Sequence, residues 1–90
     1  MPQITVASSL RRHVDCAGQF DLPGATLAEL LVALFDQVPA LRGYVLDDQG
    51  AVRKHVTVFI DARPLADRAQ LAVPLAHGAR VALFQALSGG

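Results

Sequence analysis

Hydrophobic and polar residues alternate in several short stretches of the chain, which is the pattern of β-strands with one face in the core. In the first stretch Ile4 and Val6 share one face, with Thr5 between them on the other. In the last stretch Val81 and Leu83 are expected to face inward. The four predicted strands are residues 3–8, 19–22, 55–60 and 80–85.

One amphipathic helix is predicted between the second and third strands. Thr26 and Glu29 have capping-box spacing, so the threonine hydroxyl can accept from the Glu29 amide and the glutamate can reach back to the Thr26 amide. The helix is expected to end at Val38, because Pro39 disfavours its continuation. Its apolar face consists of Leu27, Leu30, Leu31, Leu34 and Val38.

The remaining segments are expected to be irregular. Residues 9–18 are mostly polar, and residues 39–43 are predicted to form a short turn. The segment 61–76 begins with a turn and carries three leucines expected to close the underside of the core: Leu65, Leu71 and Leu75. This order of elements predicts an α+β fold, a mixed four- to five-stranded sheet packed on one main helix. The other face of the sheet is then open to solvent or a partner.

Two phenylalanines are candidates for that open face. Phe84 and Ala82 are expected to point outward from the last strand. Phe59 is expected on the outward side of the preceding strand, where it either joins Phe84 or packs under the segment 61–76. Exposed aromatic residues often mark protein interfaces, so this face is a candidate partner surface.

Composition narrows the class of protein. The chain has 90 residues, 52% of them hydrophobic, which predicts one globular domain. Its formal net charge of zero argues against binding to nucleic acid or to an anionic membrane surface. No apolar run is long enough to span a bilayer. The first residues lack the basic start and apolar core of a signal peptide, so we expect a soluble cytoplasmic protein.

No group of residues in the sequence resembles a catalytic or metal site. His13, His55 and His77 are far apart and lack metal-ligand spacing, so no metal is expected. Cys16 is the only cysteine. The nearby arginines could lower its pKa, but no oriented base accompanies it. The chain is therefore expected to be a carrier or cosubstrate rather than an enzyme.

The end of the chain, residues 78–90, resembles the C-terminus of the MoaD/ThiS family of ubiquitin-like sulfur carriers. It departs from the family pattern at Ala79, where Asp is usual, and at Gln85, where Pro is frequent. Earlier segments with a similar likeness are Leu10-Arg11-Arg12, Gly24-x-Thr26, residues 56–61 and Pro74-Leu75. The residues of the terminal pattern that the chain keeps are Gly78, Val81, Ala86, Gly89 and Gly90.

The resemblance implies a β-grasp (ubiquitin-like) domain over residues 1–86 and a reactive tail over residues 87–90. In the family, an adenylylating and sulfurtransferase activating enzyme uses ATP and Mg to activate the terminal carboxylate, here that of Gly90. The resulting thiocarboxylate gives its sulfur to a synthase that makes molybdopterin, thiamine, cysteine or a related product. The chain itself is expected to bind no cofactor, and it could be the small subunit of such a synthase.

The resemblance also assigns roles to residues near the end. Leu87, Ser88 and Gly89 would thread the partner's active site, where glycine keeps the chain thin. Two other functions share this fold, namely a protein modifier conjugated through Gly90 and a β-grasp subunit that binds partners without being activated. The residues expected to contact the partner are Phe84, Phe59, Ala82 and Ala86.

Overall fold

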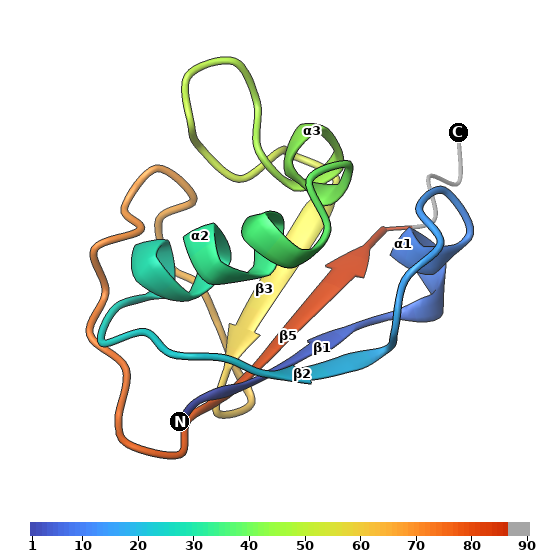
Figure 1. Ribbon diagram of the computed structural model, residues 1–90. Coiled ribbons are helices and arrows are strands. Elements are labelled where there is room, and N and C mark those ends of the chain that lie inside the picture. Colours follow the sequence, from blue (N-terminus) through green and yellow to red (C-terminus); the bar gives the residue numbers. More distant parts are fainter. Residues whose placement is uncertain (87–90) are drawn as a thin grey trace.

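One mixed sheet runs through the computed structural model of the chain, which describes residues 1–86 (Figure 1). The strands lie in the order β2-β1-β5-β3-β4. β1 and β5 are parallel, and the other neighbours are antiparallel. The sheet consists of β1 (Gln3–Val6), β2 (Gln19–Asp21), β3 (Val56–Ile60), β4 (Arg63–Pro64) and β5 (Arg80–Gln85). The predicted α+β architecture is confirmed, with five strands.

The fifth strand, β4, comes from a hairpin that the sequence indicated only as a turn. Asp61 and Ala62 have positive φ angles of 50° and 70°, which turn the chain back after β3. Arg63 and Pro64 then pair with the end of β3. Because Pro64 has no backbone N–H, its place on an edge strand agrees with the usual position of proline in sheets.

The main helix, α2 (Leu27–Gln37), begins close to where the capping box predicts. The Glu29 amide donates to Thr26 Oγ1 at 3.2 Å. The glutamate side chain accepts from the Ala25 amide at 3.2 Å rather than from the expected Thr26 amide. Of the predicted apolar face, four residues are buried against the sheet and Val38 is only partly buried; the buried ones are Leu27, Leu30, Leu31 and Leu34.

Two short helices replace segments that the pattern indicated as irregular: α1 (Ser8–Arg11) and α3 (Leu41–Val45). The prediction of a simple turn over residues 39–43 was wrong. Pro39 prevents α2 from continuing, but a new helical turn starts directly after it and buries Leu41 and Val45. These two residues are four apart and therefore lie on one face of the turn.

The segment after β4 packs where the sequence predicted, and α2 holds it in place. Leu65, Leu71 and Leu75 are partly buried against the core. The first amide groups of a helix have no partner within the helix, and here the Leu27 amide donates to the Val73 carbonyl at 2.9 Å and the Ala28 amide to the Leu71 carbonyl at 2.8 Å. The helix start therefore positions this segment.

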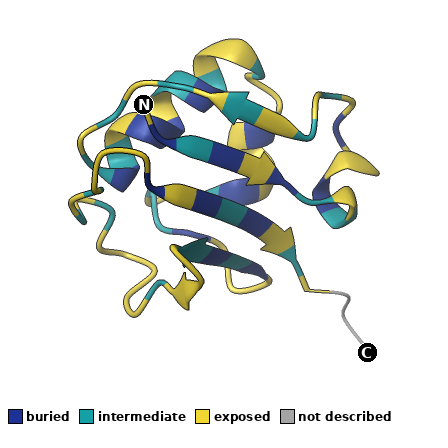
Figure 2. Ribbon diagram, turned by 90° about the horizontal axis from the view of Figure 1, so that it is seen from below, coloured by how far each residue is buried: buried dark blue, intermediate teal, exposed yellow. Residues whose placement is uncertain are grey.

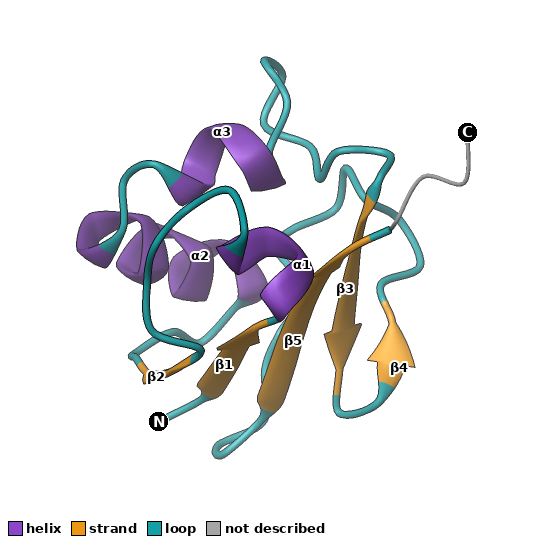
Figure 3. Ribbon diagram, turned by 90° about the vertical axis from the view of Figure 1, so that its right-hand side faces the viewer, coloured by secondary structure: helices purple, strands orange, loops and turns teal. Residues whose placement is uncertain are grey.

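The helices lie on one side of the sheet, and the other side is uncovered (Figure 3). Along β1, β3 and β5, buried residues of the inner face alternate with more exposed residues of the outer face, as Figure 2 shows from the uncovered side. The buried inner residues are Ile4, Val6, Val56, Val58, Val81 and Leu83. None of the helices in residues 1–86 has the length and apolarity needed to cross a membrane.

Candidate functional site at the end of the last strand

The predicted tail is attached to the end of β5, the central strand of the sheet. β5 pairs with β1 on one side and β3 on the other. It ends at Gln85, beside α1 (Figure 1). Ala86 is exposed and is the last described residue. The remaining predicted site residues, Leu87, Ser88, Gly89 and Gly90, lie outside the described part of the chain.

Two hydrogen bonds fix the root of the tail, which we define as Gln85 and Ala86. The Gln85 amide donates to Ser9 Oγ at 2.9 Å. β1 ends at Val6, so a hydroxyl from α1 takes the place of a backbone partner at this point. On the other side, the Ala86 amide donates to the His55 carbonyl at 2.6 Å. The tail therefore starts from a defined position.

The role of Ser9 was not predicted. The family pattern often has proline at the position of Gln85, and proline would have no N–H to satisfy. Here Gln85 has an N–H, and Ser9 accepts from it across 76 residues of sequence. No local pattern signals such a contact, because it depends on the long-range pairing of β5 beside β1.

The open face of the sheet carries the apolar residues predicted for partner contact. Across β3 and β5, Phe59 pairs with Ala82 and Thr57 pairs with Phe84, so all four share this face. The rings of Phe59 and Phe84 meet edge to face, with centroids 5.7 Å apart. Phe59 therefore lies on the open face and not under the segment 61–76. Pro64, which pairs with Phe59, extends the cluster toward the sheet edge.

The exposure of these residues differs. Phe84 is 42% exposed, a large value for an aromatic side chain in a sheet. Phe59 and Ala82 are half-buried, and Ala86 is exposed. The face is therefore an apolar surface next to the root of the tail, with Phe84 as its exposed aromatic side chain.

A hollow of about 320 Å³ lies beside the root of the tail. It is formed largely by the loops before β3 and after β4. We call it the cationic hollow, because three of its lining residues carry positive charge; it is lined by Asp47, Arg53, Lys54, His55 and Arg68. Sequence reasoning missed it, since Arg68 is brought there only by the path of the irregular segment.

Asp47 is the one carboxylate lining this hollow. Its pKa is lowered first by hydrogen bonds from the backbone amides of Ala51 and Gln49, and further by the charges of Arg68 and Arg53. Oδ1 of Asp47 accepts both amides, at 2.9 Å from Gln49 and 3.0 Å from Ala51. Asp47 is therefore ionised at neutral pH and is already occupied by its own loop.

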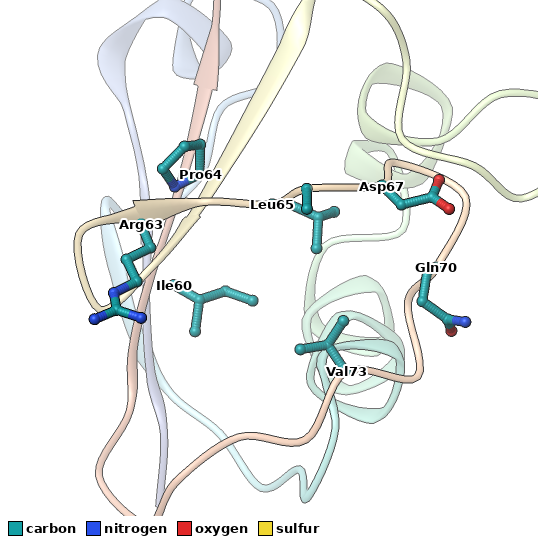
Figure 4. A pocket seen from close by; sticks show the side chains of 8 residues that line it. Ile60, Arg63, Pro64, Leu65, Asp67, Gln70 and Val73 are labelled. Carbon is teal, nitrogen blue, oxygen red and sulfur yellow. The ribbon is translucent and has the colours of Figure 1, made fainter.

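A second cavity, of about 310 Å³, lies on the inner side of the β3–β4 hairpin (Figure 4). Ile60, Leu65 and Val73 give it mainly apolar walls, with polar residues at its rim. Ile60 is at the end of β3 opposite to His55, so this cavity lies far from the root of the tail.

Cys16 and the histidines do not form a reactive site. Burial raises the pKa of the Cys16 thiol and outweighs the opposing charge of Arg11. The suggestion that nearby arginines lower this pKa was therefore wrong, and the thiol is protonated at neutral pH. His13 stacks on Tyr44 with ring centroids 5.4 Å apart. Within residues 1–86, no group of three or more His, Cys, Asp or Glu is arranged to hold a metal ion.

Comparisons with known proteins identify a family model and several solved structures that are similar to this chain. A family model described as the ThiS family matches residues 11–90. A search of curated proteins found no match. Among solved structures, SAMP1 (small archaeal modifier protein 1) from Haloferax volcanii is 28% identical, with a TM-score of 0.77 over 99% of this chain and 98% of that one.

Two further structures share the fold at lower identity. CysO from Mycobacterium tuberculosis is 18% identical, with a TM-score of 0.82 over 97% of this chain and 100% of that one. A chain of the BexX/CysO complex from Amycolatopsis orientalis is 14% identical, with a TM-score of 0.85 over the whole of both chains.

Proposed function

Because the chain belongs to the ThiS family, we propose that it is a sulfur carrier whose Gly90 carboxylate is activated by a separate enzyme. A carboxylate is a poor electrophile, so the enzyme first converts it with ATP to an acyl-adenylate and releases pyrophosphate. A persulfide sulfur then displaces AMP. A thiol reductant then cleaves the resulting acyl disulfide: it forms a new disulfide with the cysteine of the sulfur donor and leaves a thiocarboxylate on Gly90. This thiocarboxylate gives its sulfur to a synthase for molybdopterin, thiamine, cysteine or a related product.

The observation that carries this proposal is the anchored root of the tail at the end of β5. The family match extends through Gly90, and hydrogen bonds to Ser9 and His55 hold Gln85 and Ala86 at an exposed end of the sheet. Such a root can direct the following residues into a partner's active site while the domain stays folded. It supports a role in which the domain is the recognition unit and the tail the reactive group.

The chemistry is proposed to reside in the partners. In this scheme ATP and Mg bind to the activating enzyme, and the chain contributes the carboxylate and the surface that is recognised. The chain is then a cosubstrate, and it could also serve as the small subunit of a synthase. ATP for the activation is available in the cytoplasm, where we propose that the protein works.

The direct test is the intact mass of the chain after incubation with ATP, a sulfur donor and the ubiquitin-activating-type adenylating enzyme of the same genome. We expect a mass gain equal to the exchange of one oxygen for sulfur, located on the C-terminal peptide. Omission of ATP is the control. An unchanged mass, with no pyrophosphate released, would contradict the proposal.

The open face of the sheet supports docking of the activating enzyme. Phe84 is the exposed aromatic residue of its apolar cluster, and large aromatic side chains at the centre of interfaces commonly contribute more than 1 kcal/mol. We therefore expect Phe84→Ala to weaken binding to the activating enzyme about tenfold, which corresponds to about 1.4 kcal/mol. Binding can be measured by fluorescence anisotropy with labelled chain.

A matched control for Phe84→Ala is Val32→Ala. Val32 is 60% exposed, on α2 and away from the open face. We expect Val32→Ala to bind as the wild type does. Equal losses of binding affinity in the two variants would place the enzyme elsewhere on the surface. Wild-type affinity in Phe84→Ala would exclude Phe84 from the interface.

A second candidate function is protein modification through Gly90, favoured by the 28% identity to a small archaeal modifier protein. Both functions share the acyl-adenylate and differ in the nucleophile that follows, a sulfur or a lysine amine. Adducts linked to lysine, detected on a blot of the tagged chain, would favour modification. Their absence together with a thiocarboxylate would favour sulfur transfer.

A further inference from the structure

The cationic hollow lies next to the root of the tail. The His55 carbonyl holds the Ala86 amide at 2.6 Å, and His55 also lines the hollow. The wall of the hollow and the root of the tail are therefore adjacent. A protein that binds closely around Ala86 would therefore meet the wall of the hollow.

The hollow has an excess of positive charge. Arg53, Lys54 and Arg68 line it against one carboxylate, that of Asp47. Asp47 Oδ1 is used by two backbone amides of its own loop. The excess charge is thus available to a partner.

The two arginines are held in position by the fold. Arg53 Nε donates to the Gly43 carbonyl at 2.8 Å, and Arg68 Nη1 donates to the Val52 carbonyl at 3.1 Å. Each guanidinium has five N–H groups in a fixed fork, so each keeps further donors for an anion. Lys54 is exposed, and no side-chain hydrogen bond joins it to the described residues. It is a free cation beside two preorganised ones.

A second pair of cations lies on the other side of the tail root. Arg11 is the last residue of α1 and Arg12 follows it; the Ser9 hydroxyl of the same helix accepts from the Gln85 amide. Arg11 Nε donates to the Val6 carbonyl at 3.0 Å, and both arginines are exposed. Because the whole chain has a formal net charge of zero, this concentration of cations is a local feature, and local fields of this kind direct how two proteins approach each other.

We propose that the cationic hollow receives an acidic side chain of the activating enzyme, an aspartate or glutamate beside the entrance to its channel for the tail. The inference rests on the proposed activation of Gly90. A carboxylate matches the donors of Arg53 and Arg68 and the charge of Lys54. A polyphosphate is a poorer match, because the fixed negative charge of Asp47 repels a group with several negative charges more strongly than a single carboxylate. The contact sets the orientation in which the tail enters.

The test compares charge reversals at two positions in the steady-state kinetics of adenylation by the genome's own activating enzyme. We expect Lys54→Glu to raise the KM for the chain about fivefold to tenfold at low salt, with kcat unchanged, since a charge at the rim of an interface acts mainly on association. The wild-type KM should rise with salt, and this dependence should be weaker in Lys54→Glu. The control is Arg63→Glu, an equal charge change on β4, which should behave as the wild type.

The outcomes separate this inference from the proposed function. If the wild-type chain is not adenylated, the proposed function fails and the inference with it. If the wild-type chain is adenylated and Lys54→Glu keeps the wild-type KM and salt dependence, only the inference fails. An equal rise in KM for Arg63→Glu would show an effect of net charge and would also overturn it.

A second measurement tests the ligand chemistry directly. Amide chemical shifts of the ¹⁵N-labelled chain are followed during titration with a short poly-glutamate peptide and, separately, with inorganic phosphate. At low salt, we expect the peptide to change the amide chemical shifts of Lys54 and His55. Phosphate added at the same total negative charge should change them little. Equal shifts from phosphate would assign the hollow to phosphate groups and overturn the proposal, as would the absence of any shift.

Discussion

Replacing Gly90 with alanine is expected to slow adenylation of the chain at least about a hundredfold, since small displacements of a reacting group cost about this much in rate. The proposed reaction brings the terminal carboxylate to ATP through a narrow channel. Glycine has no Cβ and leaves the backbone free to adopt any conformation the channel requires. A methyl group on the last residue widens the chain next to the reacting carbon. Pyrophosphate release is the measurement.

The fold should not change in this variant, because the sheet and the helices are all formed by residues 3–85. We expect Gly90→Ala to alter the free energy of unfolding by less than about 0.5 kcal/mol, as surface substitutions usually do. Gly43→Ala is the matched control, the same chemical change at an exposed position in α3. Normal adenylation and sulfuration of Gly90→Ala would refute the role of Gly90. Full function after deletion of Gly89 and Gly90 would favour the subunit that binds partners without activation.

Gly24→Ala is expected to destabilise the fold by about 2–3 kcal/mol, because it introduces a methyl group where there is no room. A Cβ at Gly24 would lie 2.7 Å from Leu30 N and 2.9 Å from Leu30 Cα. These are backbone atoms of α2, and the Leu30 side chain is fully buried. The helix cannot move aside without disturbing its packing on the sheet. Urea denaturation followed by circular dichroism measures the loss.

Gly43→Ala again provides the comparison. A Cβ at Gly43 meets no atom within 4 Å, and alanine is favoured over glycine within a helix by about 0.5–1 kcal/mol. We therefore expect this variant to be as stable as the wild type or more so. If both variants had the same stability, the close approach of Gly24 to α2 would have no energetic consequence.

Family membership was predicted from the sequence and is confirmed, and so is the fold class. Each prediction of a strand or of the main helix rested on a local period in the positions of apolar residues. The inward Val81 and Leu83 and the outward Phe84 follow from that period alone. The position of Phe59 does not follow from that period, because it depends on whether the segment 61–76 crosses the open face of the sheet. The structure decides it through the register of β3 against β5.

The short helices show where local patterns fail. α1 buries Leu10, yet its neighbours are polar or charged, and four residues are too few to show a helical period. α3 follows a proline that indicates a break, and it forms because Leu41 and Val45 reach the core there. In both cases burial in the tertiary structure stabilises helices whose own propensity is weak.

The sequence by itself determined the alternation of the strands, the apolar face of α2, the family and the presence of a terminal Gly-Gly. These are properties of residues close together in the chain. Only the tertiary structure decided how the tail begins, because Ser9, His55 and Gln85 are distant in sequence and meet only when β5 enters between β1 and β3. The same pairing brings Arg53 and Lys54 to one side of the tail root and Arg11 and Arg12 to the other, since strand order sets which loops share an end of the sheet.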